Sequence, residues 1–205
     1  NKPVGLPVHR TPKGDENLEQ YFPALRFELP HPPLLAHRLD KETSGCLVLG
    51  RHKKALARLG HLFESGQITK QYLAIVIGGP ADERGLVSQP IRRFDLGRGK
   101  WEFRIAPDGQ EAVTEYEVLR RAEGYALLSL RPRTGRTHQL RLHCQWLGCP
   151  ILGDRFYGGA RDHVEQLFLH AARITIPYGV PPLRVDAPLP EHFLAQFARF
   201  GWDVS

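Results

Sequence analysis

The 205-residue sequence contains no methionine and only three cysteines, Cys46, Cys144 and Cys149. Three cysteines are too few, and odd in number, for a disulfide framework, so the sequence indicates a reducing, cytosolic compartment. The start, Asn1-Lys2-Pro3, is neither a signal peptide nor an initiator methionine. We therefore expect that residues upstream of Asn1 are missing from this chain.

Long apolar runs are also absent, because no stretch approaches the roughly 20 residues needed to span a bilayer. The sequence has no glycine-rich phosphate loop of either common spacing, which leaves nucleotide cofactor binding without support. A hydrophobic content of 41% with 24% charged residues is ordinary for a globular protein and excludes disorder as the main state. The length suits one large domain or two small ones.

Acidic residues are scarce relative to basic ones, which leaves a formal net charge of +6, and 21 of the 28 basic residues are arginine. The stretch 124–153 contains no acidic residue at all, but it contains Arg131, Arg133, Arg136, Arg141, His138 and His143. A stretch of one sign can follow a phosphate backbone, and arginine presents a planar fork that matches phosphate. Within it, residues 134–137 resemble a turn that leads into a helix, where anions bind. The alternative is an exposed basic face.

The hydrophobic pattern predicts helices and strands in comparable number. Apolar residues recur at helical spacing in 15–29, 53–66, 139–147 and 191–200. Strands are predicted at 46–49, 72–77, 101–105, 111–119, 125–131 and 168–176. This mixture favours an α+β fold with a largely antiparallel sheet.

A polar loop, residues 37–45, leads directly into the apolar segment 46–49. Polar residues at a strand end indicate either turn chemistry or a site. Asp40 lies between Arg38 and Lys41, so its carboxylate should stay ionised, and an approach by Arg141 would lower its pKa further. Such a carboxylate is either a nucleophile in a basic cleft or part of a structural ion pair. These residues alone favour the ion pair.

Four motifs, in the order HRLDKETSG, KQYLAIVIG, RTGRTHQLRLH and GCPILGDRFYG, resemble the RluA-type family of RNA pseudouridine synthases. The opening NKPVGLPVH is similar to that family's first segment, and the match runs from Asn1 to about Pro177. The resemblance implies a pseudouridine synthase fold, with a mixed, mainly antiparallel sheet, flanking helices and a central RNA-binding cleft. We expect residues 1–205 to form a single catalytic domain. The implied activity is isomerisation of specific uridines in tRNA or rRNA to pseudouridine, without metal or cofactor.

The resemblance also assigns roles to individual residues. Asp40 matches the family's catalytic aspartate, and Arg38 resembles the arginine that takes the place of the flipped-out base. Tyr72 matches the tyrosine that stacks on the target base, and Arg141 resembles the arginine that pairs with the catalytic carboxylate. Extruding a base costs a few kcal/mol, and an aromatic ring under that base returns about 1–3 kcal/mol. Asp40 would either attack C1′ of the ribose or abstract a ribose proton that leads to a glycal.

Further expectations concern binding. Arg133, Arg136 and His138 are candidate RNA contacts, the partner is RNA and not a membrane, and the chain is expected to act as a cytoplasmic monomer. A zinc site is not predicted, because neighbouring residues His143 and Cys144 point about 100° apart on a helix. One alternative is an RNA-binding or RNA-folding module of the same fold that has lost activity, although the trio Asp40, Tyr72 and Arg141 argues against it. A second alternative is a metal-dependent nuclease or deaminase, but the sequence lacks the clustered metal ligands that such an enzyme requires.

Overall fold

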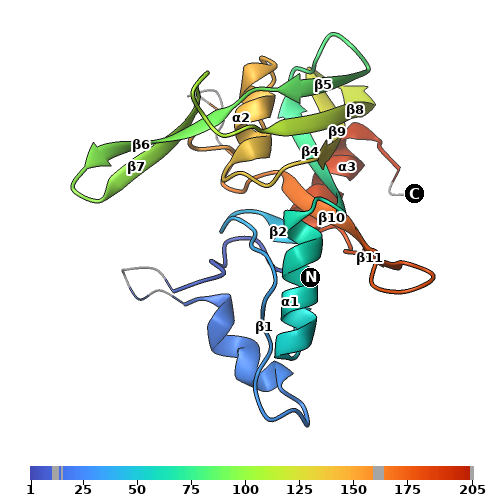
Figure 1. Ribbon diagram of the computed structural model, residues 1–205. Coiled ribbons are helices and arrows are strands. Elements are labelled where there is room, and N and C mark those ends of the chain that lie inside the picture. The colour runs from blue at the N-terminus through green and yellow to red at the C-terminus, as the bar shows by residue number, and fades with distance from the viewer. Residues whose placement is uncertain (11–13, 15, 159–163, 204–205) are drawn as a thin grey trace. The chain divides into compact units, whose positions relative to one another are not determined.

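The computed structural model describes residues 1–10, 14, 16–158 and 164–203 (Figure 1). The chain divides into two compact units, each made of segments that are not contiguous in sequence. Unit 1 contains Asn1–Thr69 and Ala171–Pro188, and unit 2 contains Lys70–His170 and Leu189–Ser205. The described residues form a mixed α+β fold with mostly antiparallel strand pairing, and this confirms the predicted fold class. The single catalytic domain stays a prediction.

Unit 1 is built from short strands and two helices. Its elements are η1 (Leu18–Leu25), β1 (Leu34–Leu35), β2 (Ser44–Gly45), β3 (Leu49–Gly50), α1 (Lys53–Glu64), the greater part of β10 (Leu169–Ile176) and β11 (Leu183–Asp186). β1 pairs with β3 and β10 pairs with β11, whereas β2 pairs with β10. The long strand β10 therefore supports the short strand β2 that follows the polar loop.

Helix α1 confirms the helix predicted at 53–66. The Nδ1 atom of His52 accepts a hydrogen bond from the Ala55 N–H at 3.1 Å, which satisfies one of the free donors at the helix start. Gly66 has φ +67°, and the amides of Gly66 and Gln67 donate to Phe63 and Leu62 at the helix end. A glycine with positive φ just beyond the last turn is a common way for a helix to end.

Two predicted elements of unit 1 differ from the structure. The helix expected at 15–29 is a 3-10 helix over Leu18–Leu25, because Pro23 has no N–H to donate inside it and Phe27 has a positive φ of 51°. Asp15 lies outside the described residues. The strand expected at 46–49 is replaced by the two-residue strands β2 and β3 on either side of residues 46–48.

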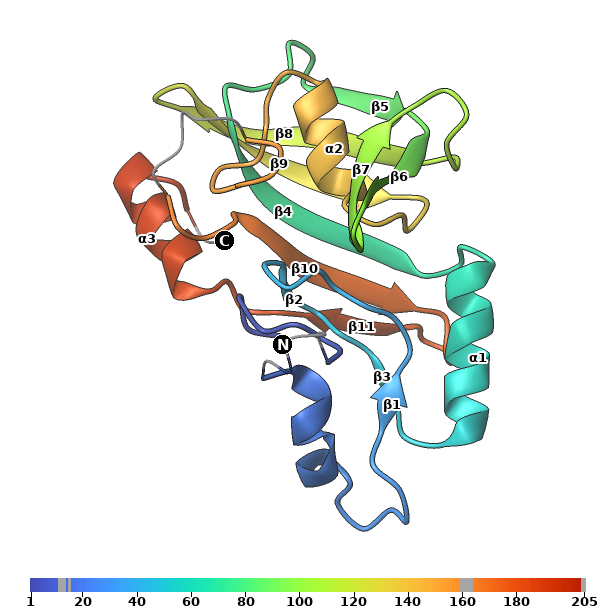
Figure 2. The same cartoon turned by 90° about the vertical axis from the view of Figure 1, so that its left-hand side faces the viewer.

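Unit 2 contains the main sheet, in the order β4-β9-β8-β5 with antiparallel pairing throughout. Its elements are β4 (Thr69–Ile77), β5 (Arg84–Ser88), β6 (Ile91–Gly97), β7 (Lys100–Ile105), β8 (Val113–Ala122), β9 (Tyr125–Pro132), α2 (Gln139–Trp146) and α3 (Glu191–Phe200). Helices α2 and α3 lie on opposite faces of this sheet (Figure 2). Strands β6 and β7 form a separate two-stranded ribbon that extends away from it (Figure 1).

The core of unit 2 surrounds the paired strands β4 and β9, between helices α2 and α3. Residues 74–76 of β4 are fully buried, and so are Leu128, Ile151 and Phe193. A continuous apolar run in a strand is expected where both faces of the sheet are covered. Among the described residues, no helix is long and apolar enough to cross a membrane.

Candidate active site

The loop that contains Asp40 is anchored by its buried neighbours. Leu39 before it is 5% exposed and Thr43 after it is buried, whereas Asp40 itself is half-buried and Arg38 is exposed. The Thr43 N–H donates to the Asp40 carbonyl at 3.1 Å, which closes a turn around residues 40–43. The buried neighbours and this turn hold the backbone of Asp40, while the half-buried side chain of Asp40 stays partly accessible.

Lys2 holds this loop in place through hydrogen bonds to backbone groups. Its buried Nζ atom donates to the carbonyl oxygens of Pro3 at 2.8 Å, Leu6 at 2.8 Å and Lys41 at 2.9 Å. Its main chain exchanges two hydrogen bonds with Gly45. Burial lowers the pKa of the Lys2 ammonium from 10.5 to about 8, although the carboxylates of Glu42 and Asp40 oppose the shift.

Gly45 closes the loop at a point where a side chain has no space. Its φ is +106°, and a Cβ atom there would collide with the backbone of Ala171. The close approach allows the Cys46 N–H to donate to the Ala171 carbonyl at 2.8 Å. Glycine is therefore required at the end of the polar loop 37–45 for both conformation and space.

Replacing Lys2 with methionine should change how stability depends on pH. The pKa of Lys2 is about 8 in the folded protein but near 10.5 in the unfolded chain. Between these values the unfolded state binds more protons, so the unfolding free energy of the parent should rise with pH relative to Lys2→Met. Denaturant titrations of both proteins at about pH 7 and about pH 9.5 measure this difference.

Lys41→Met is the matched control, because Lys41 is an exposed lysine in the same loop whose backbone, and not its side chain, contacts Lys2. The control should follow the parent at both pH values. If the parent and Lys2→Met changed equally with pH, Lys2 would keep its proton throughout, and the lowered pKa would be wrong.

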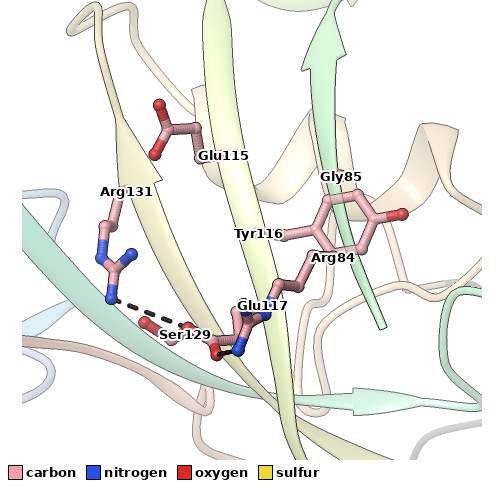
Figure 3. Close-up of a pocket in the computed structure, with 7 residues that line it drawn as sticks. All are labelled: Arg84, Gly85, Glu115, Tyr116, Glu117, Ser129 and Arg131. Atoms are coloured by element: carbon pink, nitrogen blue, oxygen red, sulfur yellow. Dashed lines mark ion pairs between the residues drawn. The ribbon is translucent and has the colours of Figure 1, made fainter. Parts of the chain in front are cut away.

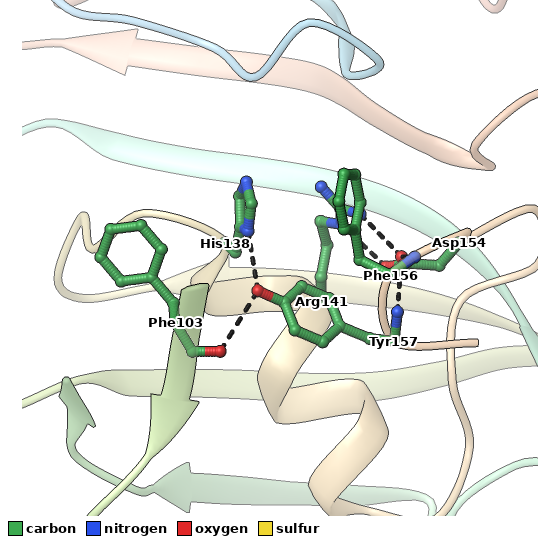
Figure 4. Close-up of polar contacts among 6 residues, drawn as sticks. All are labelled: Phe103, His138, Arg141, Asp154, Phe156 and Tyr157. Carbon is green, nitrogen blue, oxygen red and sulfur yellow. Dashed lines mark hydrogen bonds and ion pairs between the residues drawn. The ribbon is translucent and has the colours of Figure 1, made fainter. Parts of the chain in front are cut away.

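In unit 2, Arg141 forms a buried two-point ion pair with Asp154. The Arg141 Nε and Nη2 atoms donate to the two carboxylate oxygens of Asp154 at 2.7 and 2.6 Å, with the side chains 4% and 0% exposed (Figure 4). The Asp154 carboxylate also accepts from the N–H groups of Phe156 and Tyr157 at 2.9 and 3.0 Å. One carboxylate thus fixes both the guanidinium on α2 and the turn that follows Asp154.

Two aromatic rings pack against the Arg141 guanidinium. The ring centres of Phe156 and Tyr157 lie 5.2 and 5.1 Å from the Arg141 guanidinium carbon. The Tyr157 hydroxyl lies 2.8 Å from His138 Nδ1 and donates to the Phe103 carbonyl at 3.3 Å (Figure 4). His138 has a left-handed backbone, φ 56°, directly before α2. Tyr157 therefore connects the start of α2 to strand β7.

Tyr72 lies on strand β4, opposite Leu130 of β9. Its side chain is half-buried and packs against the main core of unit 2. A half-buried tyrosine near the start of a central strand has a fixed direction and still leaves part of its ring accessible. This is the placement that a base-stacking residue requires, although it is also compatible with ordinary cross-strand packing.

The predicted basic stretch is partly neutralised by carboxylates that the fold brings beside it. Arg133 donates from Nε to Glu115 at 2.6 Å, and Arg131 lies 3.7 Å from Glu117, both on the neighbouring strand β8. Arg84 of β5 also pairs with Glu117, at 2.8 Å. Figure 3 shows a pocket beside these pairs, and its lining residues are Arg84, Gly85, Glu115, Tyr116, Glu117, Ser129 and Arg131. The alternating charges make this face a ladder of cross-strand ion pairs.

The turn before α2 is held by Gln139 through four hydrogen bonds. Its carbonyl oxygen accepts from the Thr134 hydroxyl at 2.7 Å and the Arg136 N–H at 3.0 Å. Its amide donates to the Val113 carbonyl and the Thr114 hydroxyl, both at 3.0 Å. The Thr134 hydroxyl and the Arg136 N–H, in the turn that was predicted to bind an anion, therefore already donate to Gln139. The exposed Arg136 guanidinium donates from Nε to the Glu111 carbonyl.

His143 and Cys144 of α2 are buried within the protein. His143 Nδ1 lies 2.9 Å from the Thr114 hydroxyl and Nε2 lies 3.1 Å from the Gln89 carbonyl, while burial lowers the pKa of His143. Burial also raises the pKa of the Cys144 thiol. Within the residues that the structure describes, no group of three or more potential metal ligands occurs.

The structure thus places the predicted site residues in both units. Arg38 and Asp40 share one loop of unit 1, whereas Tyr72 and Arg141 belong to the sheet and to helix α2 of unit 2. The pairing of Arg141 with Asp40 stays a prediction. Sequence reasoning missed Asp154, although one signal pointed to it: it is the first acidic residue after the acid-free stretch.

Comparison with known proteins gives a consistent result. A family model described as RNA pseudouridylate synthase matches residues 1–146. An uncharacterized RNA pseudouridine synthase of Zymomonas mobilis is 40% identical over 94% of this chain and 90% of its own length. The tRNA pseudouridine synthase C of Salmonella typhimurium is 34% identical, over 98% of this chain and 85% of its own. The mitochondrial pseudouridylate synthase RPUSD4 of Bos taurus is 34% identical, over 98% and 66%.

A solved structure agrees with these relatives. The structure titled Human RNA Pseudouridylate Synthase Domain Containing 4 matches with a TM-score of 0.83 and 32% identity, covering 99% of this chain and 89% of that one. The residues that the family model matches include Asp40, Tyr72 and Arg141. The chain therefore belongs to the RluA-type family of RNA pseudouridine synthases, which are isomerases.

Proposed function

We propose that this protein isomerises uridines of tRNA or rRNA to pseudouridine, with Asp40 as its catalytic residue. The observation that carries the proposal is the family match over residues 1–146, which contains Asp40, Tyr72 and Arg141 in the expected order. The name of the Salmonella relative supports tRNA as the first substrate to test. No cofactor is invoked, because the reaction detaches uracil, turns it and rejoins it to the same ribose.

Asp40 is the group that acts on the ribose. Its half-buried carboxylate lies on a loop that Lys2, Leu39 and Thr43 hold in place, so little order has to be acquired when RNA binds. An ionised carboxylate in this position either attacks C1′ or abstracts a ribose proton. Both routes require the carboxylate to be charged and its backbone to be fixed.

Arg38 and Tyr72 handle the target base. Arg38 is exposed on the same loop as Asp40, where a long planar side chain can occupy the position of an extruded base. Tyr72 presents part of its ring from strand β4, and stacking on uracil would hold the base while its bond to ribose is broken.

Arg141 and the basic side chains complete the proposal. The Asp154 ion pair fixes the Arg141 guanidinium, which supports Arg141 as a pre-positioned charge for the catalytic carboxylate. Arg136 and His138 border the same helix start and are proposed RNA contacts. Arg133 contributes less than its charge suggests, because Glu115 pairs with it.

Location and assembly are part of the same proposal. The three cysteines are free and buried, which supports a reducing compartment, and we propose a cytoplasmic monomer. The mitochondrial name of the Bos taurus relative shows that location varies within the family.

The experiment that tests the function maps pseudouridine in RNA from cells with and without the gene, and again after the purified protein is added to the deficient RNA. We expect one or a few uridines that lose modification without the gene and regain it with added protein. An RNA-binding module without activity predicts no such site in either measurement, and that result would overturn the proposal.

A further inference from the structure

Five aromatic side chains of unit 2 form a continuous series, which we call the aromatic track: Trp101, Phe103, His138, Phe156 and Tyr157. Neighbouring ring centres are 5.4 Å apart for Trp101 and Phe103, and 5.7 Å apart for Phe103 and His138. From His138 the distances are 6.1 Å to Phe156 and 5.6 Å to Tyr157. The track therefore runs from the β6–β7 ribbon to the Arg141 guanidinium, and Figure 4 shows its members Phe103, His138, Phe156 and Tyr157.

The two ends of the aromatic track differ from its middle in exposure. Phe103 and Tyr157 pack against the small buried cluster of Ile91, Ala112 and Leu142, so ordinary core packing accounts for them. Trp101 is 51% exposed and Phe156 is 75% exposed. Large exposed rings bordering a functional site indicate a binding surface more often than isolated exposed rings do.

The middle of the track is rigid, which keeps the exposed rings in place. The Asp154 carboxylate accepts from the Phe156 N–H at 2.9 Å and fixes the backbone of that residue. The Tyr157 hydroxyl bonds both His138 and the Phe103 carbonyl, and so joins the turn to the ribbon. A pre-organised platform loses little conformational entropy when a ligand stacks on it.

The ribbon that carries Trp101 is rich in cations. Arg92 and Arg104 pair with Asp108 and Glu102, but no ion pair involves three further cations within the part of the chain that the structure describes: Arg93, Arg98 and Lys100. All three are exposed. Exposed rings interleaved with unpaired cations match the surfaces that bind single-stranded nucleic acid, where bases stack and phosphates meet positive charge.

We propose that the aromatic track binds single-stranded RNA beside the target uridine, with Trp101 and Phe156 each stacking on an unpaired base. The inference rests on the proposed function, since it takes the bound RNA to be the substrate. Bases within a duplex stack on one another and present no free faces, so the track should select unpaired nucleotides. Arg93, Arg98 and Lys100 then contact phosphates of the same strand.

The test measures binding of a labelled 12-nucleotide oligouridylate and of a 12-base-pair RNA duplex, at one fixed salt concentration. Trp101→Ala and Phe156→Ala should each weaken binding of the oligouridylate by about 5- to 150-fold. Trp101→Phe should retain most of the affinity. Trp146→Ala is the matched control, because Trp146 is 57% exposed on α2 and, among the described residues, forms no ring contact with the track; the affinity of this variant should equal that of the parent.

A second readout is independent of catalysis. In a Trp146→Phe protein, Trp101 is the exposed tryptophan and Trp202 is buried, so stacking on uracil should quench much of the exposed fluorescence. All binding is measured in an Asp40→Asn background as well, where turnover should be absent. Absence of pseudouridine formation by the parent protein, together with intact binding to the aromatic track, would refute the proposed function and leave the proposal about the track standing.

The proposal that the track binds RNA would be overturned if both Trp101→Ala and Phe156→Ala bound oligouridylate as tightly as the parent. Equal affinity for the duplex, with equal sensitivity to the substitutions, would also overturn it, because a duplex offers no base to stack. Both side chains are exposed, so we expect the variants to fold, and thermal unfolding of each confirms this before binding is compared.

Discussion

Replacing Asp40 with asparagine should reduce pseudouridine formation by at least about 10²–10⁴-fold, while RNA affinity holds or rises. Asparagine keeps the shape of the side chain but removes the charge that makes it a nucleophile or base. Removing a negative charge near phosphates favours RNA binding. Turnover and RNA affinity are measured side by side on an RNA whose modified uridine has been mapped.

Glu42→Gln is the matched control for this substitution. Glu42 is a half-buried carboxylate on the same loop, and like Asp40 it acts electrostatically on Lys2. It should retain most of the turnover, because the loss is specific to position 40 and not to the charge of the loop. Appreciable residual turnover in Asp40→Asn would remove Asp40 from the catalytic role.

Asp154→Asn should be the most destabilising single substitution proposed for unit 2. It keeps the shape of the side chain but leaves the buried Arg141 guanidinium without its counter-charge. Breaking a buried pair in this way costs about 3–5 kcal/mol. For a chain of this length, the melting temperature should fall by about 6–20 °C, and denaturant titration measures the unfolding free energy directly.

Two comparisons separate the buried pair from general effects. Asp108→Asn removes one partner of an exposed pair with Arg92, and we expect a change of about 1 kcal/mol or less. Adding Arg141→Met to Asp154→Asn should recover part of the lost stability, because the unpaired charge is gone. A loss below about 1 kcal/mol for Asp154→Asn would mean that water reaches Arg141 and that the pair is not sealed.

The elements that the sequence predicted well are those with a strong hydrophobic period. Helices α1 and α3 bury regularly spaced residues, and strand β4 contains a continuous apolar run, so local pattern and tertiary burial agree. Strand β6 was missed because it is mostly exposed in the ribbon and carries no alternation. The α-helix predicted at 15–29 was wrong because the spacing of apolar residues is helical there, but Pro23 interrupts the backbone hydrogen bonds of an α-helix.

The candidate site could be predicted only as far as its motifs extend. Asp40, Tyr72 and Arg141 came from the resemblance, whereas the pairing of Arg141 with Asp154 depends on how a turn folds back onto α2. The pairing of Arg133 with Glu115 likewise depends on the antiparallel register of β8 and β9. A stretch without acidic residues in sequence therefore acquired carboxylate neighbours in space.

The discontinuity of unit 1 has a consequence for biosynthesis. The loop of Asp40 ends at Gly45 and Cys46, whose partner is Ala171, about 125 residues later in the chain. Contacts between such distant residues form only after a large loop has closed. A ribosome makes Asp40 before it makes Lys70–His170 of unit 2, yet Ala171 of the strand that supports the Asp40 loop emerges only after that segment. The loop that carries Asp40 therefore completes its backbone support only after Lys70–His170 of unit 2 has been synthesised.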